Sequence, residues 1–377
     1  MPLSPVLDGQ VLKALLAEAD PAVTIMLSIA PAGDDPHVPA TELRRLIDQA
    51  AAVLDRRGVD RVRRDAIVAR ARDLAGGIGF AQHRDPGIAL FLTDSGGHVV
   101  SLPERPPEAA VVVGRHFYLK PLLPMLARDR RFNVLALSAA KARLLRATPY
   151  AWEELPLDAL PPEVEATAIA MEDEARSRGE TVNAASQEEL RRSLVTEQLR
   201  TIAYAVRKQL ADDEAPIVLA AEPQAAGHFR KLAGPHLGQL QEAELHLNPF
   251  ALSDANLHAR AVEVMRPLID SELDAALDRI EARLGTAEPT VAIRLEEILA
   301  AAHEGRVDTV IVAENETLWG HFDPASNKLT AHGTQGQGEE DMVNEAAVAT
   351  LRTGGRAFAV PHERMPRRVP AAALLRY

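Results

Sequence analysis

The sequence contains no cysteine among its 377 residues. This absence excludes disulfide bonds, thiolate nucleophiles, iron–sulfur clusters and zinc sites built on cysteine. The chain also lacks any run of about 18 apolar residues, the length that a helix needs to cross a bilayer. Its first residues lack the basic start and apolar stretch of a secretory signal. We therefore expect a soluble, cytoplasmic protein without a membrane partner.

Length and composition predict a folded protein with several cores. Hydrophobic residues make up 47% of the chain and charged residues 25%, which is enough apolar surface to offset the conformational entropy lost on folding. Single cores stop growing near roughly 250–300 residues, so this chain needs more than one domain. We place three domains at residues 1–128, 129–286 and 287–377.

The spacing of apolar residues predicts an α/β fold. Helical periodicity alternates along the chain with short apolar runs typical of buried strands, a pattern that favours sheets covered by helices. In the middle part, a hairpin over 132–148 is followed by an acidic segment, 158–186, that we interpret as a mobile loop. A long helical stretch follows over 255–284, and Pro267 is expected to kink or divide it.

Charge is unevenly distributed along the chain. The net charge of −12 disfavours sequence-blind DNA binding, because it repels a polyanion. Residues 105–146 nevertheless contain nine basic and only two acidic side chains, whereas residues 153–189 contain eleven acidic and two basic ones. This swing predicts a polarised molecule with one cationic surface.

The segment Gly114–Pro121 is the most informative polar stretch. Its cations alternate with aromatic residues, as on surfaces that bind phosphates and stack bases. The alternative is the start of an amphipathic helix with Phe117 and Leu119 in the core. Closely spaced cations further along the chain favour RNA. The candidate RNA-binding residues are Arg115, His116, Tyr118, Lys120, Arg128, Arg130, Arg131, Lys141 and Arg143.

No motif assigns a catalytic, metal or cofactor site. The glycine-rich segment 333–338 precedes a predicted helix, but three acidic residues follow it and the lysine of a phosphate-binding loop is missing. Four histidines lack the i, i+4 spacing of a compact metal site: His228, His236, His246 and His258. We therefore predict no catalytic residue, no metal and no cofactor. A hydrolase built around His116 or the His321/His332 pair stays open as an alternative.

Three stretches of the chain resemble the bacterial archaeo-eukaryotic release factor family, abbreviated baeRF. They are Phe132–Ser138 continuing through Pro161, Glu297–Glu314 and Pro370–Tyr377. The resemblance spans most of residues 110–377. It implies a middle domain with a ribonuclease-H-like sheet and a C-terminal domain like the kink-turn-binding ribosomal proteins. It also implies kinship with the class-one termination factors of archaea and eukaryotes and with Pelota.

The chain departs from termination factors at their catalytic tripeptide. Those factors carry Gly-Gly-Gln on a loop of the middle domain, and this sequence contains no Gly-Gly-Gln in 158–186 or elsewhere. The resemblance therefore implies a non-hydrolytic factor that associates with the ribosome or with tRNA. The net acidity favours an alternative of another class, a cytoplasmic protein–protein adaptor that has kept the fold without binding RNA.

Overall fold

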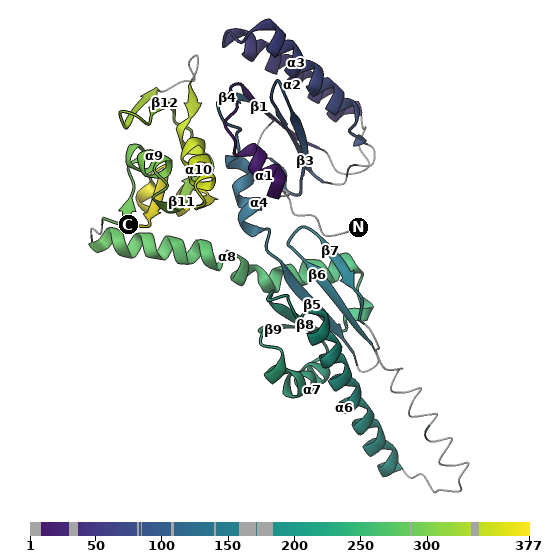
Figure 1. The fold of residues 1–377 in the computed structure, drawn as a ribbon. Helices are drawn as coiled ribbons and strands as arrows, with labels where there is room; N and C mark the ends of the chain where they lie inside the picture. Colours follow the sequence, from purple (N-terminus) through teal and green to yellow (C-terminus); the bar gives the residue numbers. More distant parts are fainter. Residues whose placement is uncertain are drawn as a thin grey trace. The chain divides into compact units, whose positions relative to one another are not determined.

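The structure is a computed structural model that describes residues 9–29, 37–80, 83, 85–106, 109–138, 141–157, 171, 184–286, 289–332 and 339–377. The described residues divide into two compact units, one formed by Asp129–Asp270 and the other by the described part of Pro5–Arg128 together with Ser271–Tyr377. Helices cover several separate sheets (Figure 1). The predicted α/β, multidomain fold class is therefore confirmed. The three domain boundaries and the ribonuclease-H-like assignment stay predictions.

The first unit is built on a five-stranded sheet of order β7-β6-β5-β8-β9. The first three strands are antiparallel, whereas β8 and β9 continue the sheet in parallel from β5. Side chains alternate along β5, so that Leu135 faces one side and Val134 the other. The strands are β5 (Phe132–Leu137), β6 (Ala142–Ala147), β7 (Trp152–Leu155), β8 (Ile217–Ala221) and β9 (Leu240–His246).

Helices cover both faces of this sheet. Helices α6 (Ala184–Gln209) and α7 (Pro223–Ala233) pack on the Leu135 face. The first half of α8 (Asp254–Thr286) packs on the Val134 face. Helix α8 continues through Pro267 as one helix, so this proline does not divide it. The other alternative, a kink at Pro267, stays a prediction. The predicted acidic loop falls almost entirely outside the described residues.

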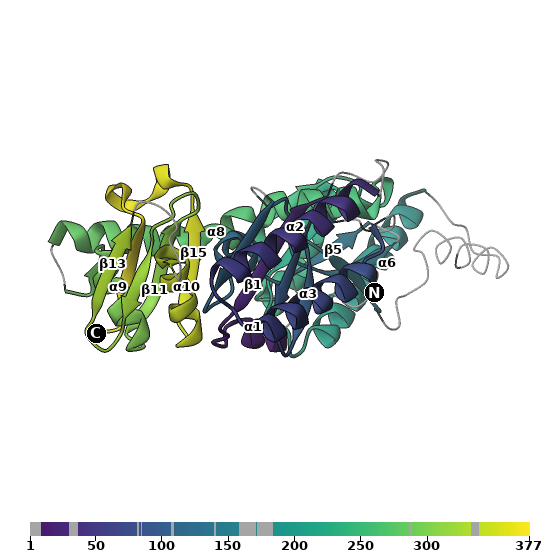
Figure 2. The same cartoon turned by 90° about the horizontal axis from the view of Figure 1, so that it is seen from above.

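The N-terminal part of the second unit holds an antiparallel sheet of order β3-β2-β1-β4. Helices α2 (His37–Arg56) and α3 (Arg61–Gly76) lie side by side over one face of this sheet (Figure 2). Apolar side chains of the two helices and of the strands pack together into one hydrophobic core. A short helix, α1 (Gly9–Leu15), precedes the sheet. The strands are β1 (Ala22–Ser28), β2 (Gly87–Leu92), β3 (Gly97–Leu102) and β4 (Ala110–Gly114).

The segment after β4 leads into two short helices, and Phe117 and Leu119 are buried, as the amphipathic-helix alternative predicts. The 3-10 helix η2 (Lys120–Leu122) and α4 (Leu123–Arg128) occupy this stretch. Pro121 and Pro124 account for the broken helix, because proline lacks the N–H that a continuous helix needs.

The C-terminal part of the second unit has a mixed sheet of order β10-β16-β11-β15. Helices α9 (Leu295–His303) and α10 (Met342–Arg352) cover one face, and the second half of α8 covers the other. These strands are β10 (Val291–Ala292), β11 (Val307–Ala313), β15 (Arg356–Val360) and β16 (Ala371–Leu375).

A small three-stranded sheet, of order β13-β12-β14, stands beside helix α10. Its strands are β12 (Trp319–Asp323), β13 (Lys328–His332) and β14 (Glu340–Asp341). The glycine-rich segment 333–338 lies outside the described residues. None of the helices described is long and apolar enough to cross a membrane.

Candidate functional site

The segment that follows β4 docks against the N-terminal end of α10. Lys120 is only 1% exposed, and its Nζ lies 2.7 Å from Asp341 Oδ2 and 2.5 Å from the carbonyl oxygen of Glu316. Asp341 also caps α10, because its Oδ1 accepts a hydrogen bond from Val343 N at 3.0 Å. Lys120 is thus part of a buried ion pair. The expectation that it belongs to an exposed cationic surface is wrong.

Asn344 fixes the backbone of the same segment. Its Oδ1 accepts hydrogen bonds from the backbone N–H groups of Leu119 and Lys120, at 2.8 and 3.0 Å. Its Nδ2 donates to the carbonyl oxygen of Phe117 at 3.1 Å. One buried amide therefore satisfies three backbone groups that the docking takes away from water.

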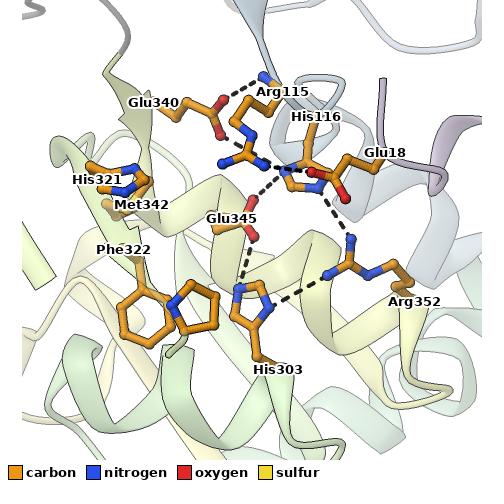
Figure 3. Close-up of a pocket in the computed structure, with 11 residues that line it drawn as sticks. Glu18, Arg115, His116, His303, His321, Phe322, Glu340, Met342, Glu345 and Arg352 are labelled. Atoms are coloured by element: carbon orange, nitrogen blue, oxygen red, sulfur yellow. Dashed lines mark hydrogen bonds and ion pairs between the residues drawn. The ribbon is translucent and has the colours of Figure 1, made fainter. Parts of the chain in front are cut away.

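A cavity of about 210 Å³ lies next to this docked segment. Charged and imidazole side chains from the turn after β4, from α9, from β12 and β14 and from α10 converge on it (Figure 3). Sequence reasoning had singled out only part of this set. The polar residues lining the cavity are Glu18, Arg115, His116, His303, His321, Glu340, Glu345 and Arg352.

Four of these side chains form a closed ring (Figure 3). Arg352 Nη1 lies 3.2 Å from His116 Nε2, and its Nη2 lies 3.5 Å from His303 Nδ1. On the far side of each imidazole, His116 Nδ1 is 2.7 Å from Glu345 Oε2 and His303 Nε2 is 3.1 Å from Glu345 Oε1. Glu340 completes the surroundings of His116, with its Oε2 3.8 Å from Nδ1.

The protonation state of His116 is under opposing influences. Burial lowers the pKa of His116, but the carboxylates of Glu340 and Glu345 outweigh it and raise the pKa to about 9. Arg352 acts against protonation, because a guanidinium only donates and its contact with Nε2 needs the lone pair of a neutral ring. Arg352 is exposed whereas Glu345 is buried, so we expect the carboxylates to dominate. Burial raises the pKa of Glu345, yet His116 and His303 hold it at about 2.

Three residues of the cavity also have the composition of a metal site. One ligand atom each from His116, Glu340 and Glu345 lies within 4.8 Å of the others. His303, Glu345 and Arg352 were not found from the sequence, because they lie far from His116 in the chain. The one signal available was polar Asn344-Glu345 inside the apolar run of α10, since buried charges need partners.

The other candidate RNA-binding residues of the second unit are paired or partly buried. Arg115 forms an ion pair with Glu18 at 2.7 Å, and Arg128 lies 3.6 Å from Glu104. Tyr118 is partly buried, which raises the pKa of its hydroxyl, and its ring lies 5.7 Å from Lys120 Nζ. Tyr118, Lys120 and Arg128 line one further cavity of about 770 Å³, together with Glu314.

The remaining candidates belong to the first unit. Arg143 contacts two carboxylates, Glu154 at 2.8 Å and Asp254 at 2.9 Å. Arg130 is partly buried, and Arg131 and Lys141 are exposed. The nine residues thus divide between the two units, and several of their charges are matched within the protein. Their assignment to RNA stays a prediction.

The predicted histidine pair of the C-terminal hairpin is not a directly opposed pair. His321 lies opposite Thr330 and Trp319 lies opposite His332, so the two histidines are diagonal neighbours at exposed positions of the hairpin. His332 Nε2 instead lies 3.3 Å from Glu339 Oε1.

Part of the chain matches a known protein family. The family model described as "Bacterial archaeo-eukaryotic release factor family 3" matches residues 131–306. This stretch carries the baeRF family 3 pattern. The match confirms the resemblance inferred from the sequence, and it covers the whole sheet of the first unit, helix α8 and helix α9.

Solved structures give matches of low similarity. Archaeal translation termination factor aRF1 is 14% identical over 98% of this chain and 96% of its own, with a TM-score of 0.23. Ribosome-bound archaeal Pelota is 14% identical over 74% and 72%, with a TM-score of 0.39. Dom34 of S. cerevisiae is 12% identical over 77% and 73%, with a TM-score of 0.36. No curated protein matches the chain.

Within the part that matches baeRF family 3, helices α6 and α7 carry an exposed basic surface. Residues 198–211 and 223–241 contain five lysines and arginines and no acidic residue. Arg200, Tyr204, Arg207 and Lys208 fall within an arc of about 100° on α6, because a helix turns by about 100° per residue. All four are exposed, and Tyr204 is 64% exposed. His228 and Lys231 are the exposed bases of the adjoining α7. We call these six residues the α6–α7 face.

Proposed function

We propose that this protein is a translation-related factor that associates with the ribosome or with tRNA and does not hydrolyse peptidyl-tRNA. The observation that carries the proposal is the match of residues 131–306 to baeRF family 3. The lack of a Gly-Gly-Gln tripeptide in the sequence supports the non-hydrolytic part, because a hydrolytic factor of this kind needs that tripeptide to position water.

The α6–α7 face is the surface we propose for RNA. In a chain of net charge −12, this group of exposed bases favours a polyanionic partner, although Glu197 pairs with Arg200 and residues 212–214 are acidic. Lysines and arginines bind phosphates and release their counterions, and an exposed tyrosine between them offers a ring on which a base stacks. Lys120 and His116 are less suited to this role, because they are buried and already paired with carboxylates.

The experiment measures co-sedimentation with ribosomal particles, and binding of labelled tRNA, at several salt concentrations. The variant Arg207→Glu with Lys208→Glu reverses two charges of the α6–α7 face. We expect at least about tenfold weaker binding, and a log–log salt slope smaller by roughly 1.4–1.8, since each phosphate contact contributes about 0.7–0.9. Tyr204→Ala should weaken binding by about 1–3 kcal/mol and leave the slope unchanged.

A matched control carries the same charge change in the second unit. Arg61→Glu with Arg72→Glu alters two arginines on α3 whose side chains are 85% and 64% exposed, and we expect it to bind like the wild type.

Binding that is equal in both double variants would contradict the assignment of the surface. Failure of the wild type to bind ribosomes and tRNA at low salt would contradict the function, and nuclease-resistant capture of a protein partner would favour the adaptor instead. Release of peptide from peptidyl-tRNA would contradict the non-hydrolytic part.

A further inference from the structure

We propose that His116, Glu340 and Glu345 bind one divalent transition-metal ion in the cavity beside α10. The site is independent of the α6–α7 face and of any RNA. It is formed by the turn after β4, by β14 and by α10, and all three belong to the second unit.

The spacing of the donor atoms fits ligands around one ion. His116 Nδ1 is 2.7 Å from Glu345 Oε2 and 3.8 Å from Glu340 Oε2. Nitrogen and oxygen ligands lie about 2.0–2.2 Å from zinc, which places neighbouring ligand atoms of one ion roughly 2.8–3.6 Å apart. The observed 2.7 Å is slightly shorter than this range, and the observed 3.8 Å is slightly longer.

The contact between the two most buried candidate ligands suggests that a metal ion could bind there. The side chains of His116 and Glu345 are 8% and 7% exposed. His116 Nδ1 and Glu345 Oε2 form an ion pair at 2.7 Å, but the contact does not have the geometry of a hydrogen bond. A buried polar atom without a hydrogen bond destabilises the fold, and an ion pair of poor hydrogen-bond geometry offsets only part of that cost. A metal ion between these atoms would satisfy both of them.

The charge of the cavity suits a cation. Three carboxylates line it, from Glu18, Glu340 and Glu345, against two guanidinium groups, from Arg115 and Arg352. Because the neighbouring carboxylates favour the protonated form of His116, a metal ion has to displace the proton on Nδ1. With the imidazoles neutral, the side chains around the cavity carry one net negative charge. An imidazole with two carboxylates favours Zn²⁺, Mn²⁺ or Co²⁺ over Mg²⁺ and Ca²⁺, which prefer oxygen ligands alone.

The surrounding residues would position the ligands. His303 binds Oε1 of Glu345 and leaves Oε2 directed at His116. A metal-bound histidine normally donates its other N–H to a second group, whereas here Arg352 directs an N–H at His116 Nε2. Arg352 therefore competes with the metal for this imidazole. Because Arg352 is exposed, it can move into solvent when the ion binds.

The experiment titrates the chelator-treated full chain with Zn²⁺ by calorimetry and with Co²⁺ by absorption spectroscopy, without RNA. We expect one Zn²⁺ per chain, a Co²⁺ spectrum that Zn²⁺ displaces, and a higher unfolding temperature with Zn²⁺. His116→Gln and Glu345→Gln should each weaken Zn²⁺ binding by at least about 100-fold, more than a change outside the ligand set would. Glu340→Gln, at a less buried position, tests the site if these variants fold poorly.

Two further variants separate a specific site from general attraction. Glu18→Gln removes a carboxylate that lines the cavity outside the ligand set, and we expect Zn²⁺ affinity close to that of the wild type. Arg352→Gln replaces the competing donor with an amide whose oxygen accepts from Nε2–H, and we expect roughly 10-fold tighter binding. The proposal is overturned if the wild type binds no Zn²⁺ in stoichiometric amount, if Glu340→Gln binds as the wild type does, or if Arg352→Gln binds more weakly.

Discussion

Two groups of cations in this protein have different surroundings. The segment around Arg115, His116 and Lys120 contacts carboxylates more than 200 residues further along the chain, such as Asp341 and Glu345. On the α6–α7 face, Arg207 and Lys208 are exposed, and no acidic residue follows Glu197 in helix α6. In the sequence alone, basic residues lie similarly close to one another in both groups. A local excess of bases therefore does not show whether the charges are available to a partner.

The largest effect is expected at the buried ion pair of the second unit. Lys120→Met keeps a long apolar stem but leaves the carboxylate of Asp341 buried without its cation. Removing one partner of a buried pair typically costs about 3–5 kcal/mol, and we expect a loss of this size in the free energy of unfolding measured with urea.

The matched control for Lys120→Met is the double variant Lys120→Met with Asp341→Asn. The asparagine keeps the cap of α10 and removes the unpaired charge, so much of the lost stability should return. A loss below about 1 kcal/mol in Lys120→Met would mean that the pair is solvated, and the contrast with the α6–α7 face would then disappear.

An intermediate effect is expected at Asn344. Asn344→Ala leaves two backbone N–H groups and one carbonyl group without their buried partner, and each such group costs about 1–3 kcal/mol before the structure relaxes. We expect an overall loss of roughly 2–3 kcal/mol by thermal or urea unfolding. Thr350→Val on the same helix removes only a bond to the carbonyl of Ala346, and it should cost less. Equal losses would show that the docked segment does not depend on this amide.

The smallest effect on stability is expected on the α6–α7 face. Arg200 forms an ion pair with Glu197 at 3.4 Å, and both side chains are well exposed. Such surface pairs contribute little, so Arg200→Ala should change the free energy of unfolding by less than about 0.5 kcal/mol. A loss above about 1 kcal/mol would mean that this arginine has a structural role, like the cations of the second unit.

Much of the fold could be predicted from apolar periodicity. The strands around Phe132–Leu137 and Ile217–Ala221 and the apolar face of α6 gave strong patterns, because they lie in continuous cores. Strands β9 and β16 were missed. Strand β9 is a half-exposed edge strand with two glutamates, and β16 contains three alanines, a residue depleted in strands. Of the two alternatives at Pro267, the division does not occur, because one proline does not end a helix that packs well on both sides of it.

The candidate site could not be predicted in the same way. Helix periodicity places Glu345 and Arg352 on one face of α10, but it does not show that His116 lies beside them. That contact depends on docking between segments that belong to different sheets. Three acidic residues at 339–341 precede α10 in the sequence, and Asp341 caps this helix. Glu340 instead lines the cavity, a role that no local pattern indicates.

The two contacts that hold the docked segment restrict sequence change in different ways. Asn344 binds only main-chain atoms, and these are the same for any residue at position 117 and for any residue except proline at positions 119 and 120. Lys120 and Asp341 depend on each other's charge, so a substitution at one is tolerated only with a compensating substitution at the other. Over evolutionary time, the amide can preserve the docking while the charged pair drifts as a unit.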